Sequence, residues 1–206
     1  MSEPVTAAKC GALLDALRVK KPLVHFITNY VTVNDCANIT LAVGGAPVMS
    51  DQPDDAAEIC RLASALVFNI GTPGDRTLEA MLRAGKAANE AGIPVVLDPV
   101  GAGASSFRNR LLEKLLEEVK FAAVKGNISE IRFLASGTGK SMGVDASKDD
   151  IALGSDSRAV ARLAAGLSRG IGAVVIVSGR IDVAADGERA YGISNGDAMM
   201  GRLTGT

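Results

Sequence analysis

The 206-residue chain carries 22 lysine and arginine residues against 23 aspartate and glutamate residues, which gives a formal net charge of −1. This balance provides no electrostatic footprint for nucleic acid or for an anionic membrane surface, so we expect neither partner. Apolar residues make up 48% of the chain, yet no stretch approaches the roughly 18 uninterrupted apolar residues of a membrane-spanning helix.

The length suits one domain with a full core, and no change in composition marks a second. The N-terminus lacks the basic and apolar regions of a secretion signal, which predicts a cytoplasmic protein. Cys10, Cys36 and Cys60 lie far apart and are odd in number, which is typical of reduced thiols, each a small core residue. The only histidine, His25, lies in an apolar run and is predicted to be a hydrogen-bonded strand residue.

Apolar runs with strand character alternate with segments of helical periodicity along the chain. The predicted strands are Leu23–Thr28, Pro47–Met49, Ala65–Ile70, Val95–Asp98, Phe121–Val124 and Ala173–Val177. The predicted helices are Ala7–Leu17, a segment capped by Thr32 and Asp35 and stopped at Gly44, Asp54–Ser64, Asp75–Ala91, Phe107–Glu118, Glu130–Ala135 and Ser157–Arg169. This alternation predicts an α/β fold, a three-layer αβα sandwich with a mostly parallel central sheet.

The last part of the chain has a different pattern. Ile181–Ala185 and Arg189–Ile193 flank the turn dipeptide Asp186-Gly187, which predicts a late β-hairpin. Earlier, Gly137–Ser141 resembles the end of a phosphate-binding loop, but Leu134 stands where that motif needs glycine, so we predict a flexible surface loop instead.

Chemistry-bearing residues follow three of the predicted strands. Asp98 closes one strand and is followed by Gly101-Ala102-Gly103, and a further strand ends at Ser178. The strand between them is followed by the segment Lys125–Glu130, which offers a cation, an amide and a carboxylate. In open α/β sheets ligands bind beyond the carboxyl ends of the strands, and phosphoryl transfer needs carboxylates for Mg²⁺ and a cation for the phosphates.

Two plainer interpretations stay open for these residues. Asp98 and Pro99 could form an ordinary turn out of a strand, and Ser129-Glu130 could cap a helix N-terminus. The glycines after Asp98 resemble a dinucleotide-binding fingerprint only weakly, because Ser106 occupies the place of its third glycine.

Five ordered motifs, spread from residue 27 to residue 206, resemble hydroxyethylthiazole kinases of the ribokinase-like superfamily. They are Ile27–Asn38, Ala46–Ser50, Leu97–Gly101, Lys125–Ile131 and Thr204–Thr206. The resemblance implies an ATP- and Mg²⁺-dependent kinase that phosphorylates the hydroxyl of 4-methyl-5-(2-hydroxyethyl)thiazole in thiamine salvage. It also implies a homotrimer with the thiazole near a subunit interface.

The resemblance also implies roles for individual residues. On the substrate side, Met49 would contact the thiazole, Asn29 and Val31 would shape its pocket, and Gly205 would bound it. On the nucleotide side, Lys125, Asn127 and Ser178 would bind ATP, while Asp98 and Glu130 would organise Mg²⁺ and its waters. Lys125 replaces the arginine usual in the family, so the bidentate fork is lost and nucleotide affinity is expected to be lower.

In the family, Thr-Gly-Thr is followed by Gly-Cys, or in related kinases by Gly-Asp, which supplies an anion hole and the base. The sequence ends at Thr206, so no catalytic base is identified. We expect a single kinase domain over residues 1–206 that lacks the anion-hole loop and the helices after it, with weak or no activity. The alternatives are a non-catalytic chain that only binds thiazole or nucleotide or only oligomerises, and another ribokinase-like enzyme such as a hydroxymethylpyrimidine kinase.

Overall fold

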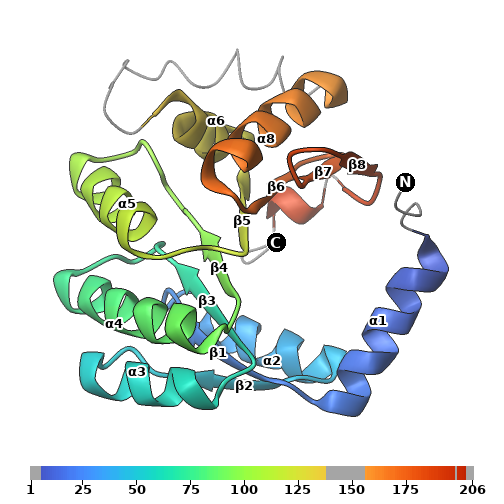
Figure 1. Ribbon diagram of the computed structural model, residues 1–206. Coiled ribbons are helices and arrows are strands. Elements are labelled where there is room, and N and C mark those ends of the chain that lie inside the picture. Colours follow the sequence, from blue (N-terminus) through green and yellow to red (C-terminus); the bar gives the residue numbers. More distant parts are fainter. Residues whose placement is uncertain (1–5, 138–155, 198, 203–206) are drawn as a thin grey trace.

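The computed structural model describes residues 6–137, 156–197 and 199–202 (Figure 1). Its strands are β1 (Leu23–Ile27), β2 (Ala46–Met49), β3 (Ala65–Asn69), β4 (Val95–Asp98), β5 (Ala123–Asn127), β6 (Val174–Ser178), β7 (Asp182–Ala185) and β8 (Ala190–Ile193). Its helices are α1 (Ala7–Lys20), α2 (Val33–Val43), α3 (Pro53–Leu62), α4 (Asp75–Ala91), α5 (Ser106–Glu118), α6 (Ile128–Ser136), α8 (Ser157–Ile171) and the 3₁₀ helix η1 (Met200–Arg202).

The described strands form one sheet in the order β2-β1-β3-β4-β5-β6-β7-β8. Neighbours from β2 to β6 are parallel, and β7 and β8 are antiparallel. The predicted mostly parallel sheet and late hairpin are therefore confirmed. The fifth strand begins and ends later than predicted, because its pairing with β6 runs from Ala123, opposite Val174, to Asn127, opposite Ser178.

Helices cover the two faces of the sheet unequally. Figure 1 shows α3, α4 and α5 on one side and α2 on the other. The direction of the crossovers explains this arrangement, because the step from β1 to β2 runs opposite to the steps from β3 to β4 and from β4 to β5. Right-handed crossovers in opposite directions place their helices on opposite faces.

Burial alternates along the central strands as a result. Leu66 and Phe68 in β3 and Leu97 in β4 are fully buried, and a Cβ added to Gly85 of α4 would lie 3.4 Å from the Phe68 ring. These residues therefore face the helices α3 to α5. The residues between them, such as Val67 and Val96, are only half-buried. Because successive side chains of a strand point to opposite faces, we call the opposite side the open face of the sheet.

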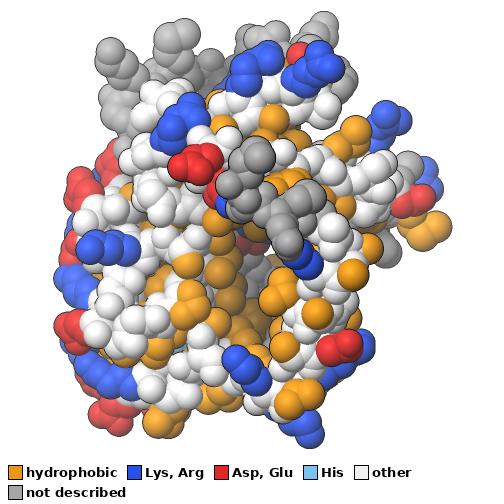
Figure 2. All heavy atoms as spheres, turned by 45° about the vertical axis from the view of Figure 1, so that its right-hand side comes forward, with side chains coloured by type: hydrophobic (Ala, Val, Ile, Leu, Met, Phe, Trp, Pro, Cys, Tyr) orange, Lys and Arg blue, Asp and Glu red, His pale blue; other side chains and the backbone are white. Residues whose placement is uncertain are grey.

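Helix α1 adds little to the core. Its apolar residues Leu13 and Leu14 are 72% and 37% exposed, and no residue of the helix is buried. The periodicity predicted the helix correctly but not what it packs against. Figure 2, which brings this side forward, shows hydrophobic side chains along the walls of a hollow.

The signals for helix ends had mixed success. Gly92 ends α4 in the left-handed conformation, with φ +70°, and its N–H donates to Ala88 and Asn89 carbonyls, as the sequence predicts. The predicted capping box of Thr32 and Asp35 is wrong, because Thr32 makes no side-chain cap bond. Its hydroxyl instead donates to Asn29 Oδ1 at 3.2 Å.

The single histidine and the cysteines take structural places. His25 is fully buried in β1, and its Nε2 lies 2.9 Å from the carbonyl oxygen of Ser50, as predicted for a hydrogen-bonded strand residue. Desolvation lowers the pKa of its imidazole, against the opposing effect of that hydrogen bond. Cys60 belongs to the core, whereas Cys10 is exposed and Cys36 half-buried, so the core prediction fails for these two.

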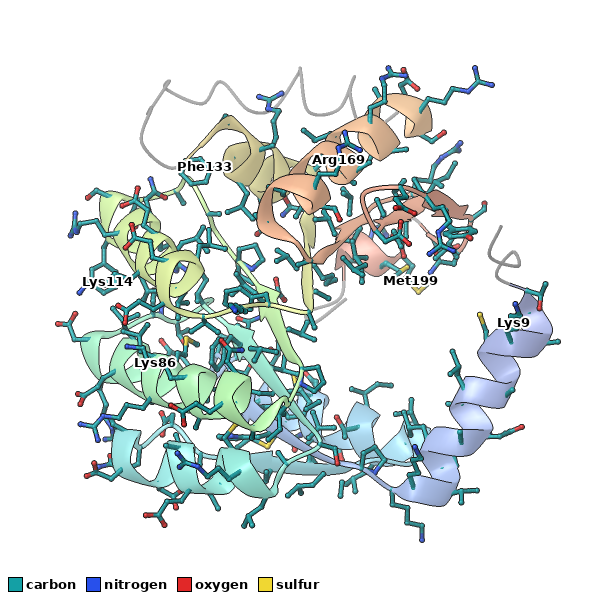
Figure 3. All side chains as sticks on the ribbon, in the orientation of Figure 1. Lys9, Lys86, Lys114, Phe133, Arg169 and Met199 are labelled. Atoms are coloured by element: carbon teal, nitrogen blue, oxygen red, sulfur yellow. The ribbon has the colours of Figure 1, made fainter. Side chains whose placement is uncertain are left out.

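Polar contacts at the surface complete the fold. Arg169 of α8 donates to the Gly187 carbonyl at 2.6 Å and so ties α8 to the hairpin turn (Figure 3). Lys114 lies on the outer side of α5, away from the sheet (Figure 3). Residues 138–141 of the predicted surface loop lie outside the described residues. None of the helices described is both long and apolar enough to cross a membrane.

One buried glycine gives a test of the packing between α4 and α5. A Cβ at Gly85 would lie 2.6 Å and 2.9 Å from the two methyl groups of Val119, which is buried. We predict that Gly85→Ala lowers the free energy of unfolding by about 1–3 kcal/mol through overpacking, although alanine favours helix. Urea denaturation measures this change.

Gly166 in α8 provides the matched control, since a Cβ there meets no atom within 4 Å. Gly166→Ala should therefore raise the free energy of unfolding by about 0.5–1 kcal/mol. If both substitutions stabilise the protein, the close packing of Gly85 against Val119 is refuted.

Candidate functional site

Polar side chains line up where the central parallel strands end. Asn69 closes β3 opposite Asp98 at the end of β4, and Lys125 of β5 follows Val124, the partner of Leu97. Burial alternates along each of these strands, and the half-buried positions include Asn69, Asp98 and Lys125. Their side chains therefore point to the open face. The fold therefore gathers a carboxylate, a cation and an amide at the carboxyl ends of the central strands.

Asp98 is held as a carboxylate in unfavourable surroundings. The pKa of Asp98 is raised to about 6, mainly by desolvation and also by the charge of Glu130. The charge of Lys125 and the hydrogen bond from Asn69 act in the opposite direction. Asn69 Nδ2 donates to Asp98 Oδ2 at 2.8 Å. Oδ1 of Asp98 makes no hydrogen bond within the described residues, so it can accept a ligand.

Glu130 has a structural task as well as a charge. Its Oε2 accepts from the backbone N–H of Asn127 at 2.9 Å, and Asn127 Oδ1 accepts from the backbone N–H of Glu130 at 3.0 Å. The two residues form a capping box at the start of α6, so the helix-capping interpretation is confirmed for Glu130, while the N-cap residue is Asn127 and not Ser129. Oε1 of Glu130 accepts from the N–H of Gly101 at 2.9 Å, which fixes the loop after β4 to α6.

Ser178 and Asn127 lie side by side at the ends of β6 and β5. Ser178 Oγ donates to the Gly126 carbonyl at 3.3 Å, a long contact that leaves the hydroxyl easy to redirect. Asn127 is exposed, with its side-chain oxygen engaged in the capping box. Its amide nitrogen makes no hydrogen bond to any described residue.

A chain of hydrogen bonds links Asp98 to the turn before α2. Asn69 Oδ1 accepts from Asn29 Nδ2 at 2.9 Å and from the backbone N–H of Gly71 at 2.9 Å. Asn29 Oδ1 accepts from the backbone N–H groups of residues 31 and 32, each at 3.0 Å. Asn29 is only 7% exposed, so it shapes the site through the backbone of this turn.

Arg108 of α5 holds the loops after β3 and β4 together. Its guanidinium donates to the Ile70 and Val100 carbonyls at 2.5 Å and 3.0 Å, and to the Gly71 carbonyl at 2.9 Å. Carbonyl oxygens cannot bond to one another, so a cation between them joins the two loops.

The side chains at these strand ends, Asn69, Asp98 and Lys125, line a cavity of about 560 Å³, which we call the polar cavity. It is lined by Asn29, Val31, Thr32, Asp35, Cys36, Ile39, Asn69, Gly71, Thr72, Asp98, Val100 and Lys125. Cavities of this size hold small molecules. The polar cavity therefore joins the predicted metal-side residue Asp98 and the predicted phosphate-side residue Lys125 with Asn29 and Val31.

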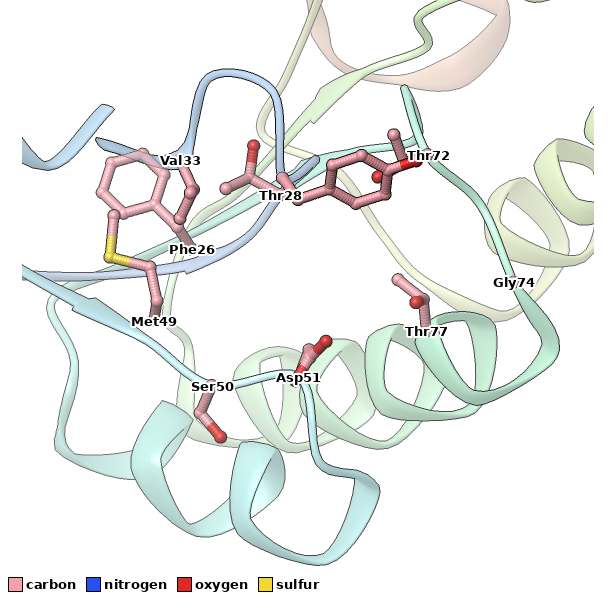
Figure 4. Close-up of a pocket in the computed structure, with 10 residues that line it drawn as sticks. Phe26, Thr28, Val33, Met49, Ser50, Asp51, Thr72, Gly74 and Thr77 are labelled. Carbon is pink, nitrogen blue, oxygen red and sulfur yellow. The ribbon is translucent and has the colours of Figure 1, made fainter. Parts of the chain in front are cut away.

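A second cavity, of about 380 Å³, contains Met49 (Figure 4). Phe26, Val33 and Met49 gather at one end of it, and Thr72 and Thr77 lie toward the other (Figure 4). We call it the Met49 cavity. Thr72 lines both cavities, so the loop after β3 stands between them.

The structure thus separates residues that the resemblance groups together. Met49 lines one cavity, whereas Asn29 and Val31 line the other. Tyr30 faces the Met49 cavity, so the turn at residues 29–32 contributes to both. Gly205, the remaining predicted substrate residue, lies outside the described residues.

Among the residues described, no group of three or more His, Cys, Asp or Glu side chains is arranged to hold a metal ion. A cation at Asp98 would therefore take most of its ligands from water and phosphate, as Mg²⁺ commonly does. A buried carboxylate with a raised pKa and an accepting oxygen fits such an ion, because the cation offsets the cost of its charge.

Sequence reasoning missed two residues of this site, Asn69 and Arg108. Asn69 had a detectable signal, since it closes an apolar strand just as Asp98 closes the next one. Arg108 had none, because a surface helix with arginines looks the same whether or not one of them reaches across to a loop.

Comparisons with known proteins agree on one family. The sequence profile of the Hydroxyethylthiazole kinase family matches residues 14–206. A hydroxyethylthiazole kinase from Clostridium beijerinckii is 50% identical over 198 residues, which are 96% of this chain and 71% of that protein. Another from Desulfovibrio desulfuricans is 52% identical over 194 residues, covering 94% and 68%.

Solved structures support the same conclusion. The hydroxyethylthiazole kinase protein from Pyrococcus horikoshii OT3 matches with a TM-score of 0.83 and 36% identity, covering 95% of this chain and 70% of that one. The adenosine kinase from Sinorhizobium meliloti, at 12% identity and a TM-score of 0.52, shares the fold, which is the ribokinase-like α/β fold expected. The chain belongs to the hydroxyethylthiazole kinase family.

Proposed function

We propose that this chain transfers the terminal phosphoryl group of ATP to the hydroxyl of 4-methyl-5-(2-hydroxyethyl)thiazole, a step of thiamine salvage. The family match over residues 14–206 carries the proposal. The row of Asn69, Asp98 and Lys125 above the polar cavity supports it, because phosphoryl transfer depends on positioning and on charge stabilisation. In the reaction the alcohol oxygen bonds to the phosphorus, the bond from phosphorus to ADP breaks, and the hydroxyl proton leaves.

The nucleotide side of the proposal rests on β5 and β6. Lys125 is half-buried, where its charge would neutralise phosphate oxygens with little screening. The amide nitrogen of Asn127 and the hydroxyl of Ser178 lie together at the same edge and would donate to the nucleotide. We assign no catalytic base among the described residues.

Asp98 and Glu130 would hold Mg²⁺, which supplies charge neutralisation to the phosphates when bound. Asp98 would do so through its accepting oxygen. Glu130, whose two oxygens each accept a backbone N–H, would act through its charge and through ordered water.

The Met49 cavity would receive the thiazole ring against Phe26, Val33 and Met49, because an apolar, methylated ring is favoured there. Asn29 and Val31 would shape the neighbouring wall, and Gly205 would bound the ring from the other side.

We also propose a cytoplasmic homotrimer. Apolar side chains that stay exposed on α1 and α2, among them Leu13, Ile39 and Leu41, support self-association.

The direct test is incubation of the chain with the thiazole alcohol, ATP and Mg²⁺. We predict slow formation of the thiazole monophosphate, because no catalytic base is assigned among the described residues, together with an equal amount of ADP, both measured by mass spectrometry. Isothermal calorimetry with each ligand should accompany this assay. Binding of thiazole or nucleotide without turnover would favour the non-catalytic alternative, and phosphorylation of a hydroxymethylpyrimidine in place of the thiazole would favour the other kinase.

Lys125 allows a gain-of-function test. We predict that Lys125→Arg lowers the KM for ATP by about three- to tenfold, because the guanidinium forms two parallel bonds to a phosphate where the ammonium acts as a point charge. The KM for the thiazole should change little. Lys120→Arg, an exposed position before β5 at the opposite end of the strands, is the control; an equal change in both variants would contradict a phosphate contact of Lys125.

The ionised Asp98 side chain, although proposed to serve the reaction, is predicted to lower the free energy of unfolding near neutral pH. Its pKa is raised from 3.8 to about 6, so the folded state favours the protonated form. Stability from this group is complete below its unfolded pKa and is lost as the pH rises through about 6. We predict that Asp98→Asn, which can still accept from Asn69, raises the free energy of unfolding at about pH 7.5 by about 1–3 kcal/mol.

Urea denaturation without divalent cations measures this difference, which should disappear below about pH 3, where Asp98 is protonated in both states. The same variant should lose phosphoryl transfer by about 10²-fold or more. An asparagine variant less stable than the natural chain at the higher pH would show that the Asp98 charge is not a burden.

A further inference from the structure

The chain of side-chain amides between Asp98 and the turn before α2 has a fixed direction. The backbone N–H groups of Gly71 and of residues 31–32 can only donate, so the side-chain oxygens of Asn69 and Asn29 must face them. This leaves the amide nitrogen of Asn69 to face Asp98, and that of Asn29 to face Asn69. Each amide therefore has one orientation that satisfies all its partners.

The chain joins three strands that are neighbours in the sheet but distant in sequence. Asn29 follows β1, Asn69 ends β3 and Asp98 ends β4. All three side chains line the polar cavity. By accepting the backbone N–H groups of residues 31 and 32, Asn29 also fixes the conformation of the turn at residues 30–32, which contributes to both cavities.

We propose that Asn69 is a positioning residue for phosphoryl transfer: it holds the carboxylate of Asp98 and, through Asn29, the turn at residues 30–32 in one hydrogen-bonded frame. Asp98 and the part of the wall of the Met49 cavity that this turn forms then keep a constant separation. Fixing reacting groups in this way is a large part of what a kinase contributes. The catalytic meaning of the frame rests on the proposed function, whereas the frame itself does not.

Gly71 shows how tightly the frame is built. A Cβ added there would lie 2.9 Å from Asn69 Oδ1, closer than real Cβ contacts allow, and 3.1 Å from Asn29 Cβ, which is tighter than most such contacts. Glycine at this position lets the loop after β3 pass directly over the two amides, and its own N–H becomes one of their partners.

Hydrogen exchange of the backbone amides at residues 31 and 32 tests the frame without any catalysis. Asn69→Asp is nearly isosteric; it keeps the acceptor for Asn29 and Gly71 but replaces the donor to Asp98 by a second carboxylate oxygen, which repels it. Asn69→Ala removes every bond of the side chain without adding a charge. We expect both variants to accelerate exchange at these two amides by about tenfold, although their own acceptor, Asn29, is unchanged.

Asn89→Asp is the matched control. Asn89 Nδ2 donates to the Lys120 carbonyl at 2.9 Å, before β5 and at the opposite end of the strands, so this variant loses one amide donor outside the site. Exchange at residues 31 and 32 should keep its natural rate there. If the Asn69 variants leave the two rates unchanged, or if Asn89→Asp raises them equally, the proposal is wrong.

Kinetics extend the test to function. The Asn69 variants should lower kcat/KM for the thiazole alcohol by about 10–10²-fold, and Asn89→Asp should leave it unchanged. If the natural chain shows no phosphoryl transfer, the proposed function fails while the exchange rates still decide whether the frame exists. If the Asn69 variants do not fold, Gly71→Ala disturbs the same two amides with every side chain of the frame retained, and should accelerate the same exchange.

Discussion

The hydrogen bond between Asn69 and Asp98 is the contact on which the rest of the site depends. It forms because β3 and β4 are parallel and in a register that sets their last residues opposite each other. From that contact, bonds extend through Asn29 to the start of α2 and through Gly71 to the loop between the cavities. Arg108 holds the same loop from the helix side of the sheet. The site is thus a property of strand register, supported from two directions.

The unequal covering of the sheet explains how a mostly apolar fold presents charged groups. Residues that face α3, α4 and α5 form the core, and the next residue along each strand is left half-buried. At the strand ends this second set is polar, so Asp98 and Lys125 are desolvated enough to interact strongly and open enough to meet a ligand. A sheet packed equally on both faces would bury the same charges without access.

Much of the fold could be predicted from the sequence, because the alternation of apolar strands and amphipathic helices depends on local periodicity. The hairpin at Asp186-Gly187 and the end of α4 at Gly92 follow from turn chemistry in the same way. Contacts between distant segments could not be predicted. The side chain of Thr32 was expected to cap a helix but bonds to Asn29, and helix α1 forms as predicted while its Leu13 and Leu14 stay exposed. For the site, Asp98 and Lys125 stood out at strand ends. Asn69 also ends a strand, but its bond to Asp98 depends on the register of β3 against β4, which the sequence does not give.

Glu130 illustrates how backbone requirements can constrain a charged residue. Its two oxygens each accept a backbone N–H, one from Gly101 and one from Asn127, so the position calls for an acceptor at both ends. Glutamine offers one oxygen and one NH₂ group, and in either orientation a backbone N–H would face a donor, at a cost of about 1–3 kcal/mol. The usual neutral replacement is therefore not a neutral change here. The backbone alone calls for a side chain with two accepting oxygens at this place, before any cation or nucleotide is considered.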